Sequence, residues 1–284
     1  MAPTEPAPLT PHAPAPHALA PHALDDCRAL SAEAGWNQTA ADWMTFFRSG
    51  TVFGITEGGT PVATGAVIAH GPRVAWIGMV LVRGDRRGGG LGTQILKVCL
   101  DHCRARGLLP VLDATPAGER VYRPLGFLPW FGLTRWDGAG GGRAAGGMRN
   151  IGPADLPRIA EADAAALGAP RPALLAGLAA SGAPALIAEA GSGFALGRPG
   201  RIATQIGPVV AEDESTAARL IEAAIAAVSG PVIIDLADHH AGLADLLRAR
   251  GFTPRRPFLR MALAQATPLG TPAHLYAAAG PEFG

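Results

Sequence analysis

The chain has 284 residues, and its formal net charge at neutral pH is +1. Hydrophobic residues make up 48% of it, which is enough apolar material for two domains with cores of their own. Because only 17% of the residues are charged, neither nucleic acid nor an anionic membrane is expected as the main partner.

Residues 1–23 repeat the stretches PHAPA, PHALA and PHALD. Proline-punctuated sequence of low complexity is typical of disorder, and the segment lacks the basic start and long apolar core of a signal peptide. No run of about 18 apolar residues continues without Gly, Pro or charge, so no membrane helix is expected. We therefore expect a disordered tail at 1–23.

The chain has three cysteines, Cys27, Cys99 and Cys103. An odd number in a long chain favours reduced thiols in a cytoplasmic protein. Cys99, His102 and Cys103 lie close together, but no second pair of ligands follows at the spacing of a zinc site. No metal is expected.

From Leu24 the pattern becomes ordered. Apolar residues recur at helical spacing in LDDCRALSAEAGW and TAADWMTFFRSG, and they alternate on both sides of a turn in TVFGITEGGTPVATGAVIAHG. A third strand, RVAWIGMVLV, leads through the loop RRGGGLG into an amphipathic helix, which is followed by a strand (LLPVLDAT), a helix (PAGERVYRPLG) and a last strand (FLPWFGLTRW). This order predicts an α/β domain with a mixed sheet.

The glycine loop between strand and helix can be compared with three phosphate-binding templates, all of which bring backbone N–H groups to an anion at a helix N-terminus. The dinucleotide fingerprint fails, because Thr93 or Ile95 occupies its last glycine position. The Walker A loop fails because Gly90 stands where its lysine belongs. The third template, RxxGxG, is filled by Arg87, Gly90 and Gly92.

The RxxGxG loop resembles the coenzyme A pyrophosphate loop of the GNAT acyltransferase superfamily. A second motif agrees with it, since Tyr122 followed by LGF at 125–127 is similar to the signature that closes the last helix of that fold. The resemblance implies an acyl-CoA N-acyltransferase with acetyl-CoA as acyl donor and no metal. It places the cofactor at Val80, Leu81, Val82, Arg86, Arg87, Gly88, Gly89, Gly90, Leu91, Gly92, Thr93 and Thr115.

The same resemblance implies catalytic roles. Tyr122 is expected to protonate the leaving thiolate, since a phenol holds its proton at neutral pH. Thr115 stands where the family usually has an Asn that bonds the pantetheine arm, and Asp113 is a candidate to receive an ammonium group or its proton. Asp113 is equally compatible with a structural role, in which its side chain caps the next helix or turn. No Glu lies in RVAWIGMVLV, so Asp113, a water chain and His70 all stay open as the general base.

After DGAGGGRAAGG the order of helices and strands begins again. We expect a catalytic domain at 24–138, a Gly-rich linker at 139–147, a degenerate GNAT-like domain at 148–265, and a tail at 266–284 that packs near the acceptor pocket. The second copy is expected not to bind coenzyme A, because AEDES places three carboxylates where a pyrophosphate would lie. The second copy also ends in LRARGF without a tyrosine at the position equivalent to Tyr122, where Asp245 lies instead.

Tandem proteins of this plan suggest acceptor contacts at Trp36, Asn37 and Tyr276, although core packing also explains Trp36. The leading expectation is transfer of an acetyl group to an amine of a small molecule, in a pocket between the two domains. The alternatives are acetylation of protein lysines or N-termini, and a non-catalytic acyl-CoA sensor. A monomer and a homodimer are both compatible with the sequence.

Overall fold

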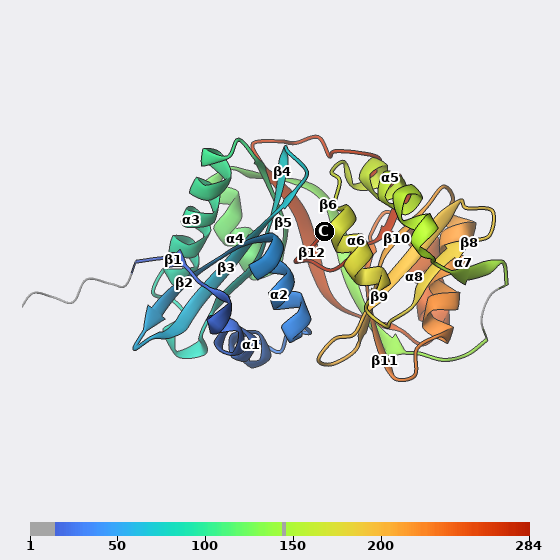
Figure 1. Ribbon diagram of the computed structural model, residues 1–284, viewed down its shortest axis with the longest axis horizontal. Helices are drawn as coiled ribbons and strands as arrows, with labels where there is room; N and C mark the ends of the chain where they lie inside the picture. The colour runs from blue at the N-terminus through green and yellow to red at the C-terminus, as the bar shows by residue number, and fades with distance from the viewer. Residues whose placement is uncertain (1–14, 144–145) are drawn as a thin grey trace, which may run out of the picture.

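The computed structural model describes residues 15–143 and 146–284. Two lobes lie side by side, each with helices packed on strands, and they share one sheet (Figure 1). The sheet has 13 strands in the order β1-β2-β3-β4-β5-β12-β6-β11-β13-β10-β9-β8-β7. A mixed α/β architecture with two related halves is therefore confirmed.

The first half contains the elements that precede the glycine-rich segment. Its strands are β1 (His17–Ala18), β2 (Gly50–Glu57), β3 (Thr60–His70), β4 (Val74–Val82), β5 (Leu109–Ala114) and β6 (Phe127–Ala139). Its helices are α1 (Leu24–Glu33), α2 (Ala40–Ser49), α3 (Leu91–Ala105) and α4 (Pro116–Tyr122), with short 3-10 turns at Pro21–Ala23, Gly84–Arg86 and Arg123–Leu125.

The second half repeats this layout. Its strands are β7 (Met148–Asn150), β8 (Ala185–Ala188), β9 (Gly193–Arg198), β10 (Thr204–Ala211), β11 (Pro231–Ala237), β12 (Thr253–Leu263) and β13 (Leu275–Ala277). Its helices are α5 (Leu156–Leu167), α6 (Pro172–Ala179), α7 (Glu214–Ala226) and α8 (Ala241–Ala249), with 3-10 turns at Pro153–Asp155 and Pro272–His274.

Sequence patterns explain the helices that frame the sheet. Thr39 and Asp42 form a capping box that starts α2, each side chain accepting from the other residue's backbone N–H. In α3 the buried residues Ile95, Cys99 and Cys103 follow one helical face and pack in a core between α3 and the sheet. A second core lies on the opposite face and takes residues from α1, α2, α5 and α6, so it is continuous across both halves.

Strands β4 and β5 form a fork. They pair in parallel only from Val74 to Trp76 and from Leu109 to Val111, although both strands continue beyond these residues. The register of β4 against β3 also shifts between Gly78 and Leu81, where Met79 has a positive φ of 54°. The bulge turns β4 away from β5, and the two strands diverge towards their carboxyl ends.

The two halves exchange their last long strands. β12, from the second half, lies between β5 and β6 of the first half, while β6 in turn pairs with β11 of the second half. β6 and β12 thus occupy equivalent places in the sheet, each lying between the other exchanged strand and a strand of the opposite half. Predicted domain boundaries at 138 and 148 therefore do not separate two independent sheets.

The second half also has a fork, but it is filled. β10 and β11 pair in parallel only over Thr204–Ile206 and Val232–Ile234, and β13 then lies between them, antiparallel to both. The approach is close at Gly207, where an added Cβ would lie 1.8 Å from the carbonyl oxygen of Ala278. The segment that follows β13 continues to the middle of the molecule, where the C-terminus lies (Figure 1).

Two expectations about the connecting segments need correction. The expected disorder at 1–23 does not hold for residues 15–23, because His17 and Ala18 pair with β2 and Leu19 bonds to Val52; residues 1–14 lie outside the described part. The expected linker at 139–147 begins inside β6, and Gly140 and Gly141 donate to backbone oxygens of the second half. Residues 144–145 are not described.

Candidate active site

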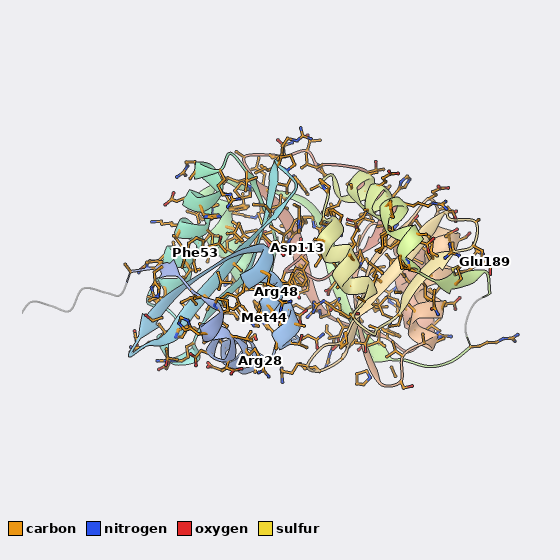
Figure 2. The ribbon with its side chains drawn as sticks, in the orientation of Figure 1. Arg28, Met44, Arg48, Phe53, Asp113 and Glu189 are labelled. Atoms are coloured by element: carbon orange, nitrogen blue, oxygen red, sulfur yellow. The ribbon has the colours of Figure 1, made fainter. Side chains whose placement is uncertain are left out.

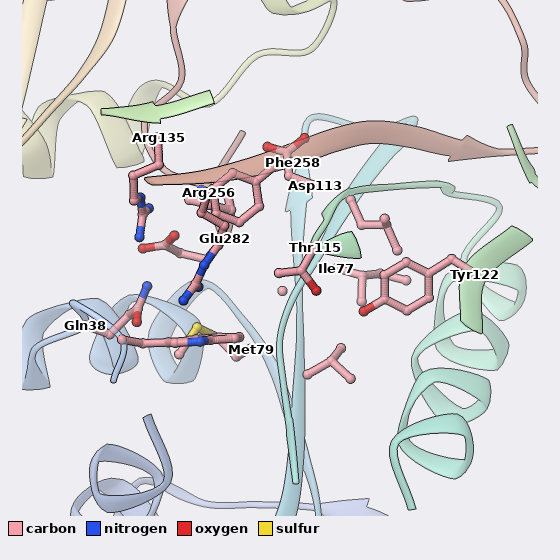
Figure 3. Close-up of a pocket in the computed structure, with 15 residues that line it drawn as sticks. Gln38, Ile77, Met79, Asp113, Thr115, Tyr122, Arg135, Arg256, Phe258 and Glu282 are labelled. Atoms are coloured by element: carbon pink, nitrogen blue, oxygen red, sulfur yellow. The ribbon is translucent and has the colours of Figure 1, made fainter. Parts of the chain in front are cut away.

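A pocket opens where β4 and β5 diverge, with an empty volume of about 600 Å³ including its open mouth. Figure 3 shows its two ends: Tyr122 stands at one end, Gln38, Glu282, Arg135 and Arg256 lie at the other, and Thr115 and Ile77 lie between them. The walls come from the first half, from both exchanged strands and from the C-terminal segment. The pocket is thus built jointly by the two halves.

The predicted pyrophosphate loop lies at the N-terminus of α3. Gly88 and Gly90 have φ values of 81° and 77°, in the left-handed region that glycine tolerates, and Gly90 is the N-cap of the helix without a side chain to cap it. Residues 85–90 are exposed, and a Cβ on Gly88 or Gly90 would meet nothing within 4 Å. The amides of the first helical turn are therefore open to an anion.

The corresponding helix of the second half is closed to an anion. Asp213 caps α7, its carboxylate accepting from the backbone N–H of Thr216 at 2.8 Å. Glu214 adds another negative charge in the first turn. This capping, together with β13 in the fork, explains physically why the second half lacks the features of a coenzyme A site.

The two arginines of the loop differ in their surroundings. Arg86 is ion-paired with Glu57 from the neighbouring β2, and Arg87 donates from Nε to the carbonyl oxygen of Val82 at 3.1 Å. Both side chains are exposed. Arg87 therefore lies against the strand that leads into the loop, and the charge of Arg86 is partly balanced.

The strand residues assigned to the cofactor lie around the fork. Val80 lines the pocket, whereas the Leu81 side chain is buried in the core of the other face. Val82 lies beside the loop, because a Cβ on Gly92 would be 3.5 Å from its Cγ2. Leu91 and Thr93 are half-buried in the first turn of α3. The structure thus brings the predicted loop, helix start and strand together in one region.

Tyr122 is the last residue of α4 and lines the apolar end of the pocket. Its ring packs near Phe127, with 5.9 Å between ring centroids, and folds back over Gly118, where a Cβ would be 2.9 Å from Cε2. Burial of the phenol raises its pKa to about 12, with a smaller contribution from Cys99. Tyr122 therefore holds its proton throughout the neutral range and can donate it.

Thr115 and Asp113 lie at the end of β5. Thr115 caps α4, its hydroxyl oxygen accepting from the Gly118 N–H at 3.1 Å, which leaves the hydroxyl proton available to a ligand. Asp113 is held in a buried ion pair, with both carboxylate oxygens accepting from Arg260 of β12. Burial raises the pKa of Asp113, and the Arg260 guanidinium opposes that rise.

The role expected for Asp113 therefore needs correction: its oxygens hold Arg260, so the side chain is engaged in joining the halves. His70 is engaged as well, because its Nε2 donates to the backbone oxygen of Phe283 at 2.8 Å. Burial, with help from Arg171, lowers the pKa of His70 to about 3. The geometry thus favours neither Asp113 nor His70 as general base.

The three residues expected to contact the acceptor lie in different places in the structure. Trp36 lines the pocket. Asn37 is buried and bonded to the loop of the second half, donating to Ala203 and accepting from the amides of Ile202 and Ala203. Tyr276 lies in β13, stacked on His240 with 4.0 Å between centroids, within the core of the second half. Contrary to expectation, neither Asn37 nor Tyr276 lines this pocket.

Sequence reasoning missed the polar end of the pocket. The C-terminal tail does pack there, but through Pro281 and Glu282, which line the pocket. Backbone oxygens of the tail are fixed by Trp76, which donates to Pro281 at 3.1 Å, and by Arg171, which donates to Phe283 at 2.8 Å. Arg135 and Arg256 come from the exchanged strands, and no local pattern marks them as neighbours.

Within the described ranges, none of the helices is long and apolar enough to cross a membrane. In the same residues no group of three or more His, Cys, Asp or Glu side chains is arranged to hold a metal ion. All three cysteines are buried and free, and burial raises the pKa of Cys103 to about 11.

Comparisons with known proteins agree with this geometry. Residues 20–127 match the model of the acetyltransferase (GNAT) family, and residues 159–277 match a second acetyltransferase (GNAT) domain model. A curated relative, holothin acyltransferase from Pseudoalteromonas sp. (strain SANK 73390), is 28% identical over 201 residues, covering 68% of this chain and 67% of the relative.

Solved structures share the fold over most of the chain. A candidate acetyltransferase from Pyrococcus horikoshii is similar with a TM-score of 0.81 and 19% identity, covering 99% of both chains. A tandem GNAT protein from the clavulanic acid biosynthesis pathway has a TM-score of 0.60 and 13% identity, covering 87% of this chain and 97% of its own. With two family domains in succession and the fork, loop and tyrosine assembled in the first, this chain is a tandem member of the GNAT family of acyltransferases.

Proposed function

We propose that the first half binds acetyl-CoA and transfers its acetyl group to an amine of a small molecule. The observation that carries the proposal is the difference between the two forks. In the first half the fork opens into a pocket beside an uncapped, exposed glycine loop, whereas in the second half β13 fills the fork and Asp213 caps the helix. One donor site per chain follows.

The roles of the residues follow from where they lie. The amides at the start of α3 favour a pyrophosphate through hydrogen bonds and the helix dipole. Thr115 offers its hydroxyl proton to the pantetheine arm within the fork. In the transfer, the amine nitrogen forms a bond to the thioester carbonyl carbon, the carbon–sulfur bond breaks, and Tyr122 protonates the departing thiolate.

Tyr122 then regains a proton from solvent, and the proton lost by the amine passes to a base at the polar end of the pocket. The thioester oxygen gains negative charge in the tetrahedral transition state and requires a hydrogen-bond donor. A backbone N–H in the bulged stretch from Val80 to Val82 is our proposal for that donor, since the bulge faces the pocket through Val80.

Enclosure of the pocket favours a small acceptor over a protein chain. The acceptor end is walled by the exchanged strands and the C-terminal segment, so a substrate must fit between the halves. A protein lysine or N-terminus would need an open groove at this point. The curated relative is named as an acyltransferase acting on holothin.

The proposal is tested by thiol release. Purified protein is incubated with acetyl-CoA and a panel of small amines and lysine-containing peptides, and free coenzyme A is measured. Turnover of small amines with little turnover of peptides supports the proposal. Saturable acetyl-CoA binding without turnover of any amine would instead favour an acyl-CoA sensor.

A further inference from the structure

The polar end of the pocket contains an arginine whose charge is not balanced locally. Arg256 is half-buried and lines the pocket, and no carboxylate of the described residues lies within the 4.0 Å of an ion pair. The other arginines around it are paired: Arg135 with Asp235, and Arg260 with Asp113.

Arg256 also faces another arginine. It lies directly opposite Arg135 in the antiparallel pairing of β12 with β6. Like charges at opposite positions of neighbouring strands destabilise a sheet. Burial and the charge of Arg135 both lower the pKa of Arg256, in agreement with an unfavourable position for a cation. An anion bound at this place would relieve the repulsion.

Two buried oxygens at the same end of the pocket lack partners. Glu282 is 3% exposed, and one of its oxygens accepts from Arg198, while Oε2 has no hydrogen-bond partner. Gln38 is 6% exposed, and its Oε1 also has none. Both residues line the pocket. A buried oxygen without a donor carries a desolvation cost, which a bound donor group would remove.

The guanidinium of Arg256 and the unpartnered oxygens of Glu282 and Gln38 thus lie in one pocket. They do not bond to each other, since Arg256 and Glu282 form no ion pair. Figure 3 shows both side chains on the side away from Tyr122. An acceptor with an ammonium group and a carboxylate close together satisfies both: the ammonium donates to Glu282 and Gln38, and the carboxylate accepts from Arg256.

We infer that the acceptor is an amino acid or a similar amine that carries a carboxylate, with Arg256 as the residue that selects for the carboxylate and Glu282 as the residue that holds the amine. This inference rests on the proposed function. Loss of the ammonium proton to the free oxygen of Glu282 then leaves the neutral amine that attacks the thioester, so the proton is accounted for within the pocket.

The test compares amines that differ only in the carboxylate. Thiol release from acetyl-CoA is measured with the common L-amino acids and with their carboxamides, which keep the α-amine and lose the negative charge. We expect at least one amino acid to be turned over with a kcat/KM roughly 10- to 100-fold above that of its carboxamide.

Variants assign the preference to Arg256. In Arg256→Gln we expect the preference for the acid to disappear, while acetyl-CoA binding measured by calorimetry is unchanged. In Arg256→Lys we expect part of the preference for the acid to be present. Arg255→Gln is the matched control, because Arg255 is exposed and paired with Asp137 at the surface. The Arg255→Gln variant should prefer the acid over the carboxamide as strongly as the wild type does.

Three results overturn the inference. If acids and carboxamides are turned over equally well, acceptor selection by Arg256 is wrong while amine acetylation stands. If Arg256→Gln keeps the preference of the wild type, another group binds the carboxylate. Absence of turnover with every amine would remove the proposed function itself, and the inference with it.

Discussion

Arg260 of β12 donates from Nε and Nη2 to the two carboxylate oxygens of Asp113 on β5, each at 2.8 Å. The exchanged strand β6 repeats the arrangement, since Arg135 donates to both oxygens of Asp235 on β11 at 2.8 Å. Each half thus fixes the last long strand of the other through an arginine–aspartate pair at directly opposite register positions. Figure 2 shows Asp113 near the middle of the molecule, with Phe53 in the left lobe and Glu189 at the right end.

We predict that Asp113→Asn chiefly lowers stability. Both side chains of the Asp113–Arg260 pair are 1% exposed, and removal of one partner from a buried pair costs about 3–5 kcal/mol. Denaturant unfolding measures the loss. Asp101→Asn is the control: it breaks an exposed pair with Arg104 and should cost less than about 1 kcal/mol. A normally stable Asp113→Asn protein with greatly reduced turnover would restore a catalytic role to Asp113.

Local features of the active site could be predicted from the sequence, because they depend on neighbours in the chain. Strand, glycine loop and helix follow one another between residues 74 and 105, so the open helix start proposed to bind an anion is encoded within one segment. The same holds for Tyr122, which is placed by the short helix α4 that Thr115 caps.

Contacts between distant segments could not be predicted in this way. The partner of Asp113 lies 147 residues further on, and that of Asn37 lies 166 residues further on. The exchange of β6 with β12 cannot be recognised in the sequence of either strand. An antiparallel partner strand requires the same residue pattern whether it comes from the first half or the second. Within the tail YAAAGPEFG, only the structure shows that Tyr276 enters the second fork whereas Glu282 reaches the pocket.

Tyr122→Phe tests the general acid. The substitution removes only the hydroxyl group, so the fold and acetyl-CoA affinity should be unchanged, while kcat falls about 100-fold or more. Because burial raises the pKa of Tyr122 to about 12, the wild-type phenol stays protonated, and kcat should show no loss from its ionisation between pH 7 and 10. Steady-state kinetics beside calorimetry would measure both. Equal kcat values in the two proteins would contradict the role of Tyr122.

Because of His70, we predict that the free energy of unfolding depends on pH. Its pKa is about 3 in the folded protein and about 6.5 when unfolded, so the unfolded chain binds a proton that the folded chain does not. Its contribution is therefore complete above pH 6.5 and is lost as the pH falls, by about 2–3 kcal/mol at pH 4.5. His70→Gln can still donate to Phe283 and should flatten this part of the stability–pH curve. Parallel curves for the two proteins would contradict the prediction.

The second half should not gain a cofactor site when two of the three carboxylates at the start of α7 are neutralised. In the double variant Glu212→Gln and Glu214→Gln the repulsion is reduced, but β13 still lies between β10 and β11 and Asp213 still caps α7. Calorimetric titration with acetyl-CoA should therefore still show one site per chain. A second site would mean that charge alone, and not the filled fork, prevents binding.

We propose that the glycine loop of the first half holds the pyrophosphate of acetyl-CoA. The most direct test is calorimetric titration of the wild type and of the double variant Gly90→Glu and Gly92→Glu, with Ser215→Glu at the start of α7 as control. We predict one saturable site in the wild type and in the control, and no binding in the double variant, which circular dichroism should show to be folded. Unchanged binding in the folded double variant, or none in the wild type, would show that the loop does not hold the pyrophosphate.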